Sequence, residues 1–115
     1  MKSCTDVNQS EKLAEILPVE SADMMWDDWS LIDEGWKLIA GYYPEIEKDY
    51  GRKCYPAWSL AALLDILPKG TRLLKSATGD TYHCDCPKGN IDKWYDNPVD
   101  ACIEMIFALK KRNLL

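Results

Sequence analysis

Apolar residues recur at every third or fourth position near the end of the chain, which is the spacing of one face of an α-helix. The stripe consists of Val99, Cys102, Ile103, Ile106 and Leu109. Asn97 precedes it as a favourable capping residue, and Pro98 occupies the first helical position, where its missing N–H is not needed. Basic residues at 110–112 suit the negative end of the helix dipole. The pattern predicts a C-terminal helix with one buried face.

Two shorter segments show the same helical spacing. The first follows Ser10, a favourable cap, and stops at Pro18. Its apolar residues are Leu13, Ile16 and Leu17. The second follows Ser59 and stops at Pro68. Its apolar residues are Leu60, Leu63, Leu64 and Leu67. We therefore predict one helix near the N-terminus and another in the middle of the chain.

Strands are expected in two regions. Residues 71–76 and 81–86 flank the turn-forming sequence Ala-Thr-Gly-Asp, which predicts a β-hairpin. A loop at 87–90 separates this hairpin from a short third strand expected at 91–95.

The earlier region is less regular. Residues 22–26 and 36–43 read as strands, with helix as the alternative for both. Residues 45–55 are expected to form a loop, because Gly51 lies within them and Pro56 directly follows.

The order of these elements is helix, strands, helix, strands, helix, and it predicts an α+β fold. We expect a two- or three-layer α/β sandwich with a mainly antiparallel sheet and about three helices. The length of 115 residues suits a single domain covering 1–115. Within it, residues 1–9 are expected to be flexible, and residues 26–55 to form a variable aromatic-acidic insertion.

Three segments carry a resemblance to known proteins. Residues 13–24 read LAEILPVESADM, residues 58–68 read WSLAALLDILP, and residues 96–106 read DNPVDACIEMI. Together with the hairpin between the last two, they resemble a group of uncharacterised small proteins of gut-bacterial phages and mobile elements. The layout is also similar, more distantly, to the phage alpha-beta-alpha sandwich domain. The resemblance covers roughly 10–25 and 56–115, and it implies a fold and a phage or mobile-element origin but no catalytic residues.

Charge and composition narrow the classes of partner. The formal net charge is −5, so the whole chain lacks the basic footprint of a nucleic-acid-binding protein. No apolar run approaches the roughly 20 residues of a membrane-spanning helix. Five cysteines and the absence of a secretory signal in this sequence suit a reducing compartment. We expect a cytoplasmic protein with no nucleic-acid partner and no membrane association.

Acidic and aromatic residues are concentrated in one part of the chain. Residues 20–49 contain nine acidic side chains and two lysines, a net charge of −7, and eight of the twelve aromatics lie between 26 and 58. Trp and Tyr are favoured anchors of binding surfaces. The predicted protein-binding residues are Trp26, Asp27, Asp28, Trp29, Asp33, Glu34 and Trp36. Two alternatives stay open, namely that the rings fill the core or that they form a carbohydrate site.

A second set of candidate residues is the sequence His-Cys-Asp-Cys at 83–86. On a strand, Cys84 and Cys86 would point to one face and His83 to the other. Two thiolates can serve as zinc ligands, but a closed structural site needs four ligands. Separately, the basic neighbours of Cys54 would lower the pKa of its thiol.

The chain contains no Gly-rich phosphate loop, nucleophile elbow or metalloprotease signature. We therefore expect a non-enzymatic accessory protein, without a cofactor, that binds an unknown protein partner through the acidic-aromatic residues. The alternative is a thiol- or zinc-dependent protein that uses residues 83–86.

Overall fold

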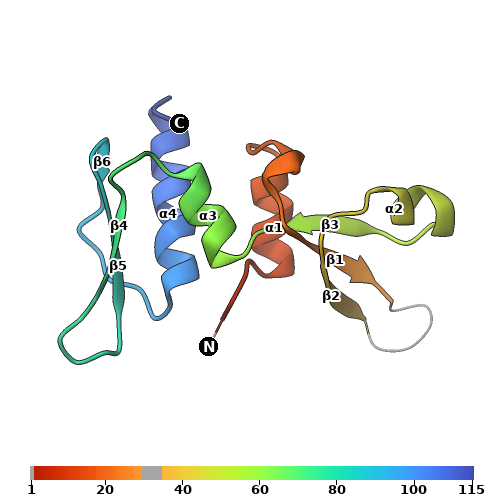
Figure 1. Cartoon of the computed structure of the whole chain (residues 1–115), viewed down its shortest axis with the longest axis horizontal. Coiled ribbons are helices and arrows are strands. Elements are labelled where there is room, and N and C mark those ends of the chain that lie inside the picture. The colour runs from red at the N-terminus through yellow and green to blue at the C-terminus, as the bar shows by residue number, and fades with distance from the viewer. Residues whose placement is uncertain (1, 30–34) are drawn as a thin grey trace. The chain divides into compact units, whose positions relative to one another are not determined.

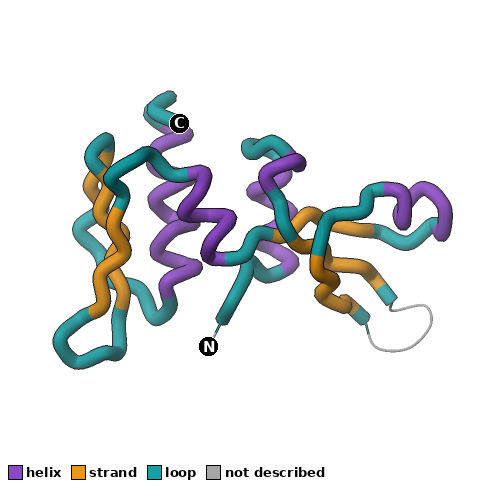
Figure 2. Tube along the Cα trace, in the orientation of Figure 1, coloured by secondary structure: helices purple, strands orange, loops and turns teal. Residues whose placement is uncertain are grey.

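The computed structural model describes residues 2–29 and 35–115 (Figure 1). They form two compact units. We call residues 4–59 the N-terminal unit and residues 2–3 with 60–115 the C-terminal unit. Each contains a three-stranded antiparallel sheet and helices, which confirms the predicted α+β class with antiparallel sheets (Figure 2). A single domain over 1–115 would unfold as one cooperative unit, and it stays a prediction.

The N-terminal unit is built on the sheet β2-β1-β3, whose strands are β1 (Met24–Asp28), β2 (Trp36–Ala40) and β3 (Cys54–Ala57). Helix α1 (Val7–Ala14) packs against β3, and a single 3₁₀ turn, η1 (Val19–Ser21), leads into β1. Helix α2 (Glu45–Tyr50) lies between β2 and β3 in sequence. The fully buried side chains are Thr5, Ser10, Leu13, Met25, Asp27, Ala57 and Trp58.

Helix α1 starts earlier than the sequence pattern predicts. Asp6 is its cap, accepting a hydrogen bond from the Gln9 backbone while the Gln9 side chain accepts one from the Asp6 backbone. Ser10 is not the cap; it is buried inside the helix with its hydroxyl oxygen 2.7 Å from that of Thr5. Before the helix, Cys4 forms an isolated β-bridge with Ser59 and Thr5 is fully buried, while the flexibility expected over 1–9 stays a prediction.

The described residues within 26–55 include β2 and parts of β1 and β3, which together make up most of the sheet, and the variable insertion expected there stays a prediction. Strands near 22–26 and 36–43 are confirmed as β1 and β2. The loop predicted at 45–55 is wrong, because this stretch holds α2 and the start of β3. Gly51 ends α2 in the left-handed region, with φ of 69°. The missed strand β3 pairs with β1 along its length, from Met24 opposite Ala57 to Asp27 opposite Cys54.

The C-terminal unit follows the sequence pattern more closely. It consists of α3 (Leu60–Ile66), β4 (Arg72–Lys75), β5 (Tyr82–Cys86), β6 (Gly89–Asn90) and α4 (Pro98–Lys111), with strand order β4-β5-β6. Both predicted helices and the hairpin are confirmed, and all five residues of the α4 stripe are at most 2% exposed. The third strand predicted at 91–95 is wrong, because pairing shifts to β6 and to an isolated bridge between Tyr82 and Tyr95.

One face of this sheet is closed by α4, which contacts β5 and β6, and α3 packs on α4. A Cβ atom added at Gly89 would lie only 2.9 Å from Leu109 Cδ2, so β6 approaches α4 very closely. Asn97 caps α4 by accepting a hydrogen bond of 2.8 Å from the Asp100 N–H. None of the helices in the described part of the chain is both long and apolar enough to cross a membrane.

Candidate functional site

The strand register divides the predicted binding residues between two faces of the N-terminal sheet. Trp26 lies opposite Leu38 and Tyr55, and Asp28 lies opposite Trp36. Because successive strand residues point to opposite faces, these five residues share one face, which we call the aromatic face. The aromatic face comprises Trp26, Asp28, Trp36, Leu38 and Tyr55. Asp27, between two of them in sequence, belongs to the opposite face, with Lys37 and Cys54 as its cross-strand neighbours.

The rings of the aromatic face are fixed in position but partly open to solvent. The Trp26 indole N–H donates to the Thr5 carbonyl at 2.9 Å, and the Trp36 and Tyr55 rings lie 5.5 Å apart between centroids. All three are only partly buried, and Leu38 on the same face is 38% exposed. The face therefore offers ordered apolar area at small further entropy cost, as binding anchors do.

A lysine lies beside this face. The Lys53 ammonium lies 5.4 Å from the Tyr55 ring centroid. A hydrogen bond with Tyr55 raises the pKa of Lys53, and the carboxylates of Glu11 on α1 and Glu47 on α2 raise it further.

Asp27 is not part of any exposed acidic surface, contrary to the sequence-based prediction. Its exposed fraction is 0%. The Arg52 guanidinium donates two hydrogen bonds of 3.0 Å to the carboxylate, from Nε to Oδ1 and from Nη2 to Oδ2. The Trp29 indole N–H donates to Oδ2 at 2.7 Å. A buried carboxylate needs such donors because it has lost its water, and the planar guanidinium fork matches its geometry.

Arg52 and Trp29 are themselves held by stacking. The guanidinium carbon lies 4.6 Å from the Trp29 ring centroid and 5.1 Å from that of Tyr50, and the Lys37 ammonium lies 4.8 Å from the Trp29 ring. Hydrogen bonding from Arg52 holds the pKa of Asp27 below its ordinary value, although burial opposes this. Asp27, Trp29 and Arg52 thus form one cluster in which the donors of the buried carboxylate are themselves held by ring contacts.

Cys54 lies beside this cluster, and its environment is the reverse of the activating one expected from its basic neighbours. Its thiol is 3.6 Å from Asp27 Oδ1. Burial, reinforced by the Asp27 charge, raises the pKa of Cys54 from 9.0 to about 11. The positive charge of Arg52 lowers the pKa of Cys54, but this effect is smaller than that of burial. The thiol therefore stays protonated and poorly nucleophilic at neutral pH.

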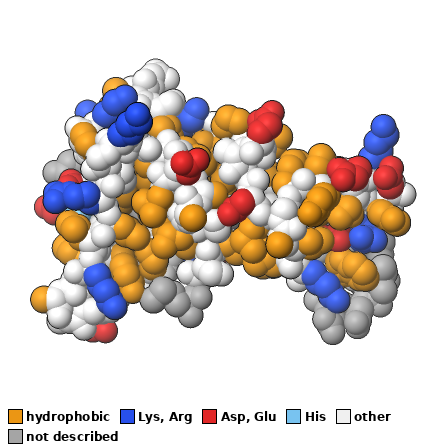
Figure 3. Space-filling view, in the orientation of Figure 1, with side chains coloured by type: hydrophobic (Ala, Val, Ile, Leu, Met, Phe, Trp, Pro, Cys, Tyr) orange, Lys and Arg blue, Asp and Glu red, His pale blue; other side chains and the backbone are white. Residues whose placement is uncertain are grey.

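The acidity of the N-terminal unit resides mainly on its helices and turns. Asp33 and Glu34 lie outside the residues that the structure describes. The exposed carboxylates elsewhere in the unit are those of Asp6, Glu11, Glu15, Glu20, Asp23, Glu45, Glu47 and Asp49. Counted over 4–59, twelve acidic and five basic residues give the unit a net charge of −7. Acidic side chains are visible over α1 and α2 in Figure 3.

The second candidate set does not assemble a ligand cage. Cys84 and Cys86 are 3% and 5% exposed on the α4 side of β5, while His83 points to the other face. Hydrogen bonding to Cys84, together with burial, raises the pKa of Cys102. Within 2–29 and 35–115, no three His, Cys, Asp or Glu residues are grouped so that they could hold a metal ion.

Comparison with protein-family models, with curated proteins and with solved structures finds no match for this chain. Its function must therefore be inferred from the geometry of the two units, and the phage or mobile-element origin implied by the resemblance stays a prediction.

Proposed function

We propose that the chain is a non-enzymatic accessory protein whose N-terminal unit binds a basic surface of another protein. The observation that carries the proposal is the aromatic face, where Leu38 is exposed and the rings of Trp26 and Trp36 remain partly exposed although a hydrogen bond holds the first and a ring contact the second. Large, rigid rings of this kind contribute most of the binding energy at many protein interfaces.

The charge of the unit supports a basic partner. A net charge of −7 on 56 residues attracts cationic surfaces and speeds their association at low ionic strength. Asp28 lies on the aromatic face itself and adds to the negative charge beside the rings. If the chain comes from a phage or mobile element, the partner is a host protein or one that the element encodes.

The experiment is a pull-down from lysate of the native host, with three baits. The first is the wild type, the second carries Trp36→Ala and Leu38→Ala, and the third carries Trp94→Ala. Trp94 is a matched control because it is an exposed tryptophan, 44% accessible, in the other unit.

We expect a basic protein that the wild type and the Trp94 variant retain, that the double variant loses, and that elutes at raised salt. Equal retention by all three folded baits, or no specific partner at all, would refute the proposal. Asp27 is unsuitable for this test, because its replacement would disturb the buried cluster that it forms with Arg52 and Trp29.

A further inference from the structure

Strand β2 is an outer strand of the N-terminal sheet, and the hydrogen bonds around it show which way its backbone groups point. The Trp29 N–H donates to the Gly35 carbonyl, and the Gly41 N–H donates to the Asp23 carbonyl. Both pairs continue the register of β1 against β2, and in an antiparallel ladder hydrogen-bonded pairs alternate with non-bonded pairs. The odd-numbered positions of β2 therefore bond to β1, and the even-numbered positions turn their N–H and C=O groups outward.

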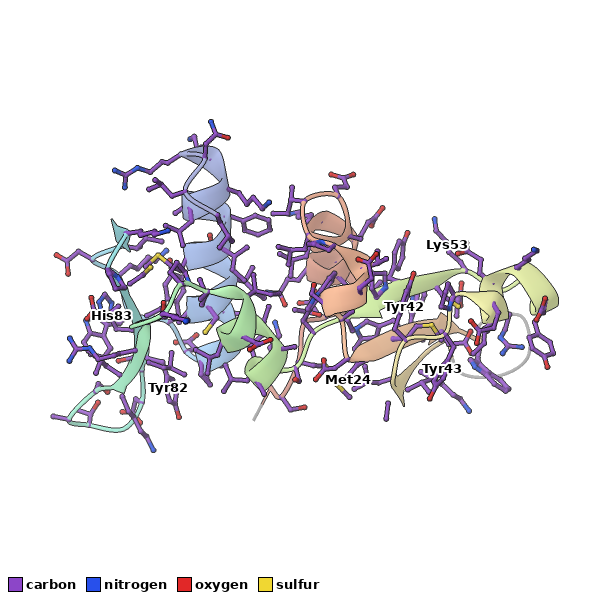
Figure 4. All side chains as sticks on the ribbon, turned by 45° about the horizontal axis from the view of Figure 1, so that its top comes forward. Met24, Tyr42, Tyr43, Lys53, Tyr82 and His83 are labelled. Atoms are coloured by element: carbon purple, nitrogen blue, oxygen red, sulfur yellow. The ribbon has the colours of Figure 1, made fainter. Side chains whose placement is uncertain are left out.

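Trp36, Leu38 and Ala40 occupy the even-numbered positions, and we call their outward backbone groups the β2 edge. None of the strands in the described part of the chain pairs with this edge. Leu38 is 38% exposed and Ala40 is exposed as well, so the strand is open to solvent. In Figure 4, Lys53, directly before β3, lies at the opposite margin of the sheet. A row of outward N–H and C=O groups is complementary to the backbone of another extended strand.

The other sheet edges are protected in ways that the β2 edge is not. Proteins protect edge strands with proline, charged side chains, short length or a covering segment. Strand β3 contains Pro56 and has α1 packed against it, β4 has Arg72 and Lys75 among its four residues, and β6 has only two residues. Strand β2 has five residues, no proline and one charge, that of Lys37. The Lys37 ammonium lies 4.8 Å from the Trp29 ring centroid, so this charge is held against its own unit.

The β2 edge is complementary to a second copy of itself. An antiparallel pair with a two-fold axis at Leu38 would place Leu38 opposite its own counterpart and Trp36 opposite Ala40 of the second copy. All three positions would then lie in hydrogen-bonded pairs, so every outward N–H and C=O group of both copies would have a partner. The large Trp36 ring would meet the small Ala40 side chain. Lys37 would lie opposite Ile39, so no like charges would face each other.

We propose that the chain forms a two-fold homodimer through the β2 edge, which joins the N-terminal sheets of two copies into one sheet of six strands. Any extended strand satisfies the backbone groups, but a second copy also matches the facing side chains in size and charge. A two-fold pairing uses the edge of each copy once, so the assembly ends at two copies. The contact is small, and the dimer is correspondingly weak. This inference goes beyond the proposed function, since it concerns the edge of the sheet and not the partner of the aromatic face.

The first test is sedimentation equilibrium of the full chain up to about 1 mM, where we expect a monomer–dimer equilibrium with a Kd of roughly 10 μM–1 mM. Ala40→Pro should weaken the dimer about tenfold or more, because each copy loses an outward N–H. A proline is tolerated at this edge position, because the lost N–H does not bond within the sheet. Ala40→Ser is the matched control, since it keeps the N–H and the small side chain, and its Kd should stay within about twofold of the wild-type value.

A cysteine cross-link tests the register and decides the question even if the proline variant does not fold. Across the two-fold axis, the Cα atoms of residue 38 would lie about 5.5 Å apart, within the range that a disulfide spans. Under mild air oxidation, Leu38→Cys should therefore form a disulfide-linked dimer. Leu74→Cys is the matched control, because Leu74 is also a leucine 38% exposed on an outer strand, and it should stay largely monomeric. The wild type measures the background from the five native cysteines.

Salt separates this dimer from the binding of a basic partner. Raising the salt from about 50 to 500 mM should strengthen the dimer, because it screens the repulsion between two units that each have a net charge of −7. The same change should release a basic partner. A wild type that stays monomeric at about 1 mM, a folded Ala40→Pro variant that dimerises like the wild type, or equal cross-linking of the two cysteine variants would each overturn the proposal.

Discussion

Asp27 and Asp28 are neighbours in sequence, yet only Asp27 is fully buried, and its surroundings decide how it contributes to stability. Arg52 and Trp29 together donate three hydrogen bonds to its carboxylate. If the carboxylate is removed, a partly buried guanidinium and an indole N–H lose their partners at the same time. Breaking one side of such a buried pair costs more than the pair contributes when intact.

We expect Asp27→Ala to lower the free energy of unfolding by about 3–5 kcal/mol, as measured by urea denaturation. Asp49→Ala serves as the control, because Asp49 is exposed on α2 and its loss should change stability by no more than about 0.5 kcal/mol. Similar effects of the two substitutions would show that the Asp27–Arg52 pair adds little to the fold.

The lowered pKa of Asp27 also predicts how stability depends on pH. Since its pKa is lower in the folded chain than the ordinary 3.8, the carboxyl stabilises the fold above that value. This contribution is lost as the pH falls below about 3.8 and passes through the lower folded pKa. Urea denaturation from neutral pH to about pH 2 should show that the free energy of unfolding falls more steeply for the wild type than for Asp27→Asn. Parallel profiles would contradict the assignment.

Among the secondary-structure elements, α4 is the one in which sequence and structure agree best. Ile106 is 0% exposed within its buried stripe. Ile106→Ala should therefore destabilise the protein by about 2–5 kcal/mol, through lost burial and a cavity. Glu104→Ala is the matched control on the same helix, because Glu104 is exposed and should change the urea midpoint very little. A wild-type midpoint for the Ile106 variant would refute this packing.

The contrast between α4 and α2 shows which elements a sequence can predict. The signals of α4 are local, namely a cap, a proline and an apolar stripe. The sequence around α2 also carries signals, with Pro44 before its first residue and Gly51 after its last, but the helix is short and has no buried face to give a periodic pattern. The capping box of α1 is equally visible as Asp6 followed by Gln9. Strand β3 has no such signal, because it is short and contains Pro56.

The candidate sites show the same limit. Alternation along β1 places Asp27 and Asp28 on opposite faces, but it cannot tell which face is inside. That choice depends on Arg52, which lies 25 residues further along the chain. The sequence does not reveal the ring pair of His83 and Trp94 either. The pattern around His83 points to metal ligation, whereas Trp94 comes from beyond the hairpin.

For the whole molecule, the property to measure is whether the two units unfold in one cooperative transition. Four of the five tryptophans, Trp26, Trp29, Trp36 and Trp58, lie in the N-terminal unit. Tryptophan fluorescence therefore reports mostly on that unit, while circular dichroism also follows α4 in the other. If 1–115 is a single domain as predicted, Ile106→Ala should lower both urea midpoints equally. Separate midpoints for the two probes would show that the units unfold independently.

The alternation along β1 has a consequence for how this protein can evolve. Met25 and Asp27 are fixed by what surrounds them inside the unit, whereas Trp26 and Asp28 belong to the partly exposed face. Under the proposed function, changes in the partner's surface over generations could thus be matched by substitutions at every second position of the strand, without disturbing the interior. A library randomised over Met24–Asp28 and selected for folding alone should accept many residues at every second position and few at the positions between them.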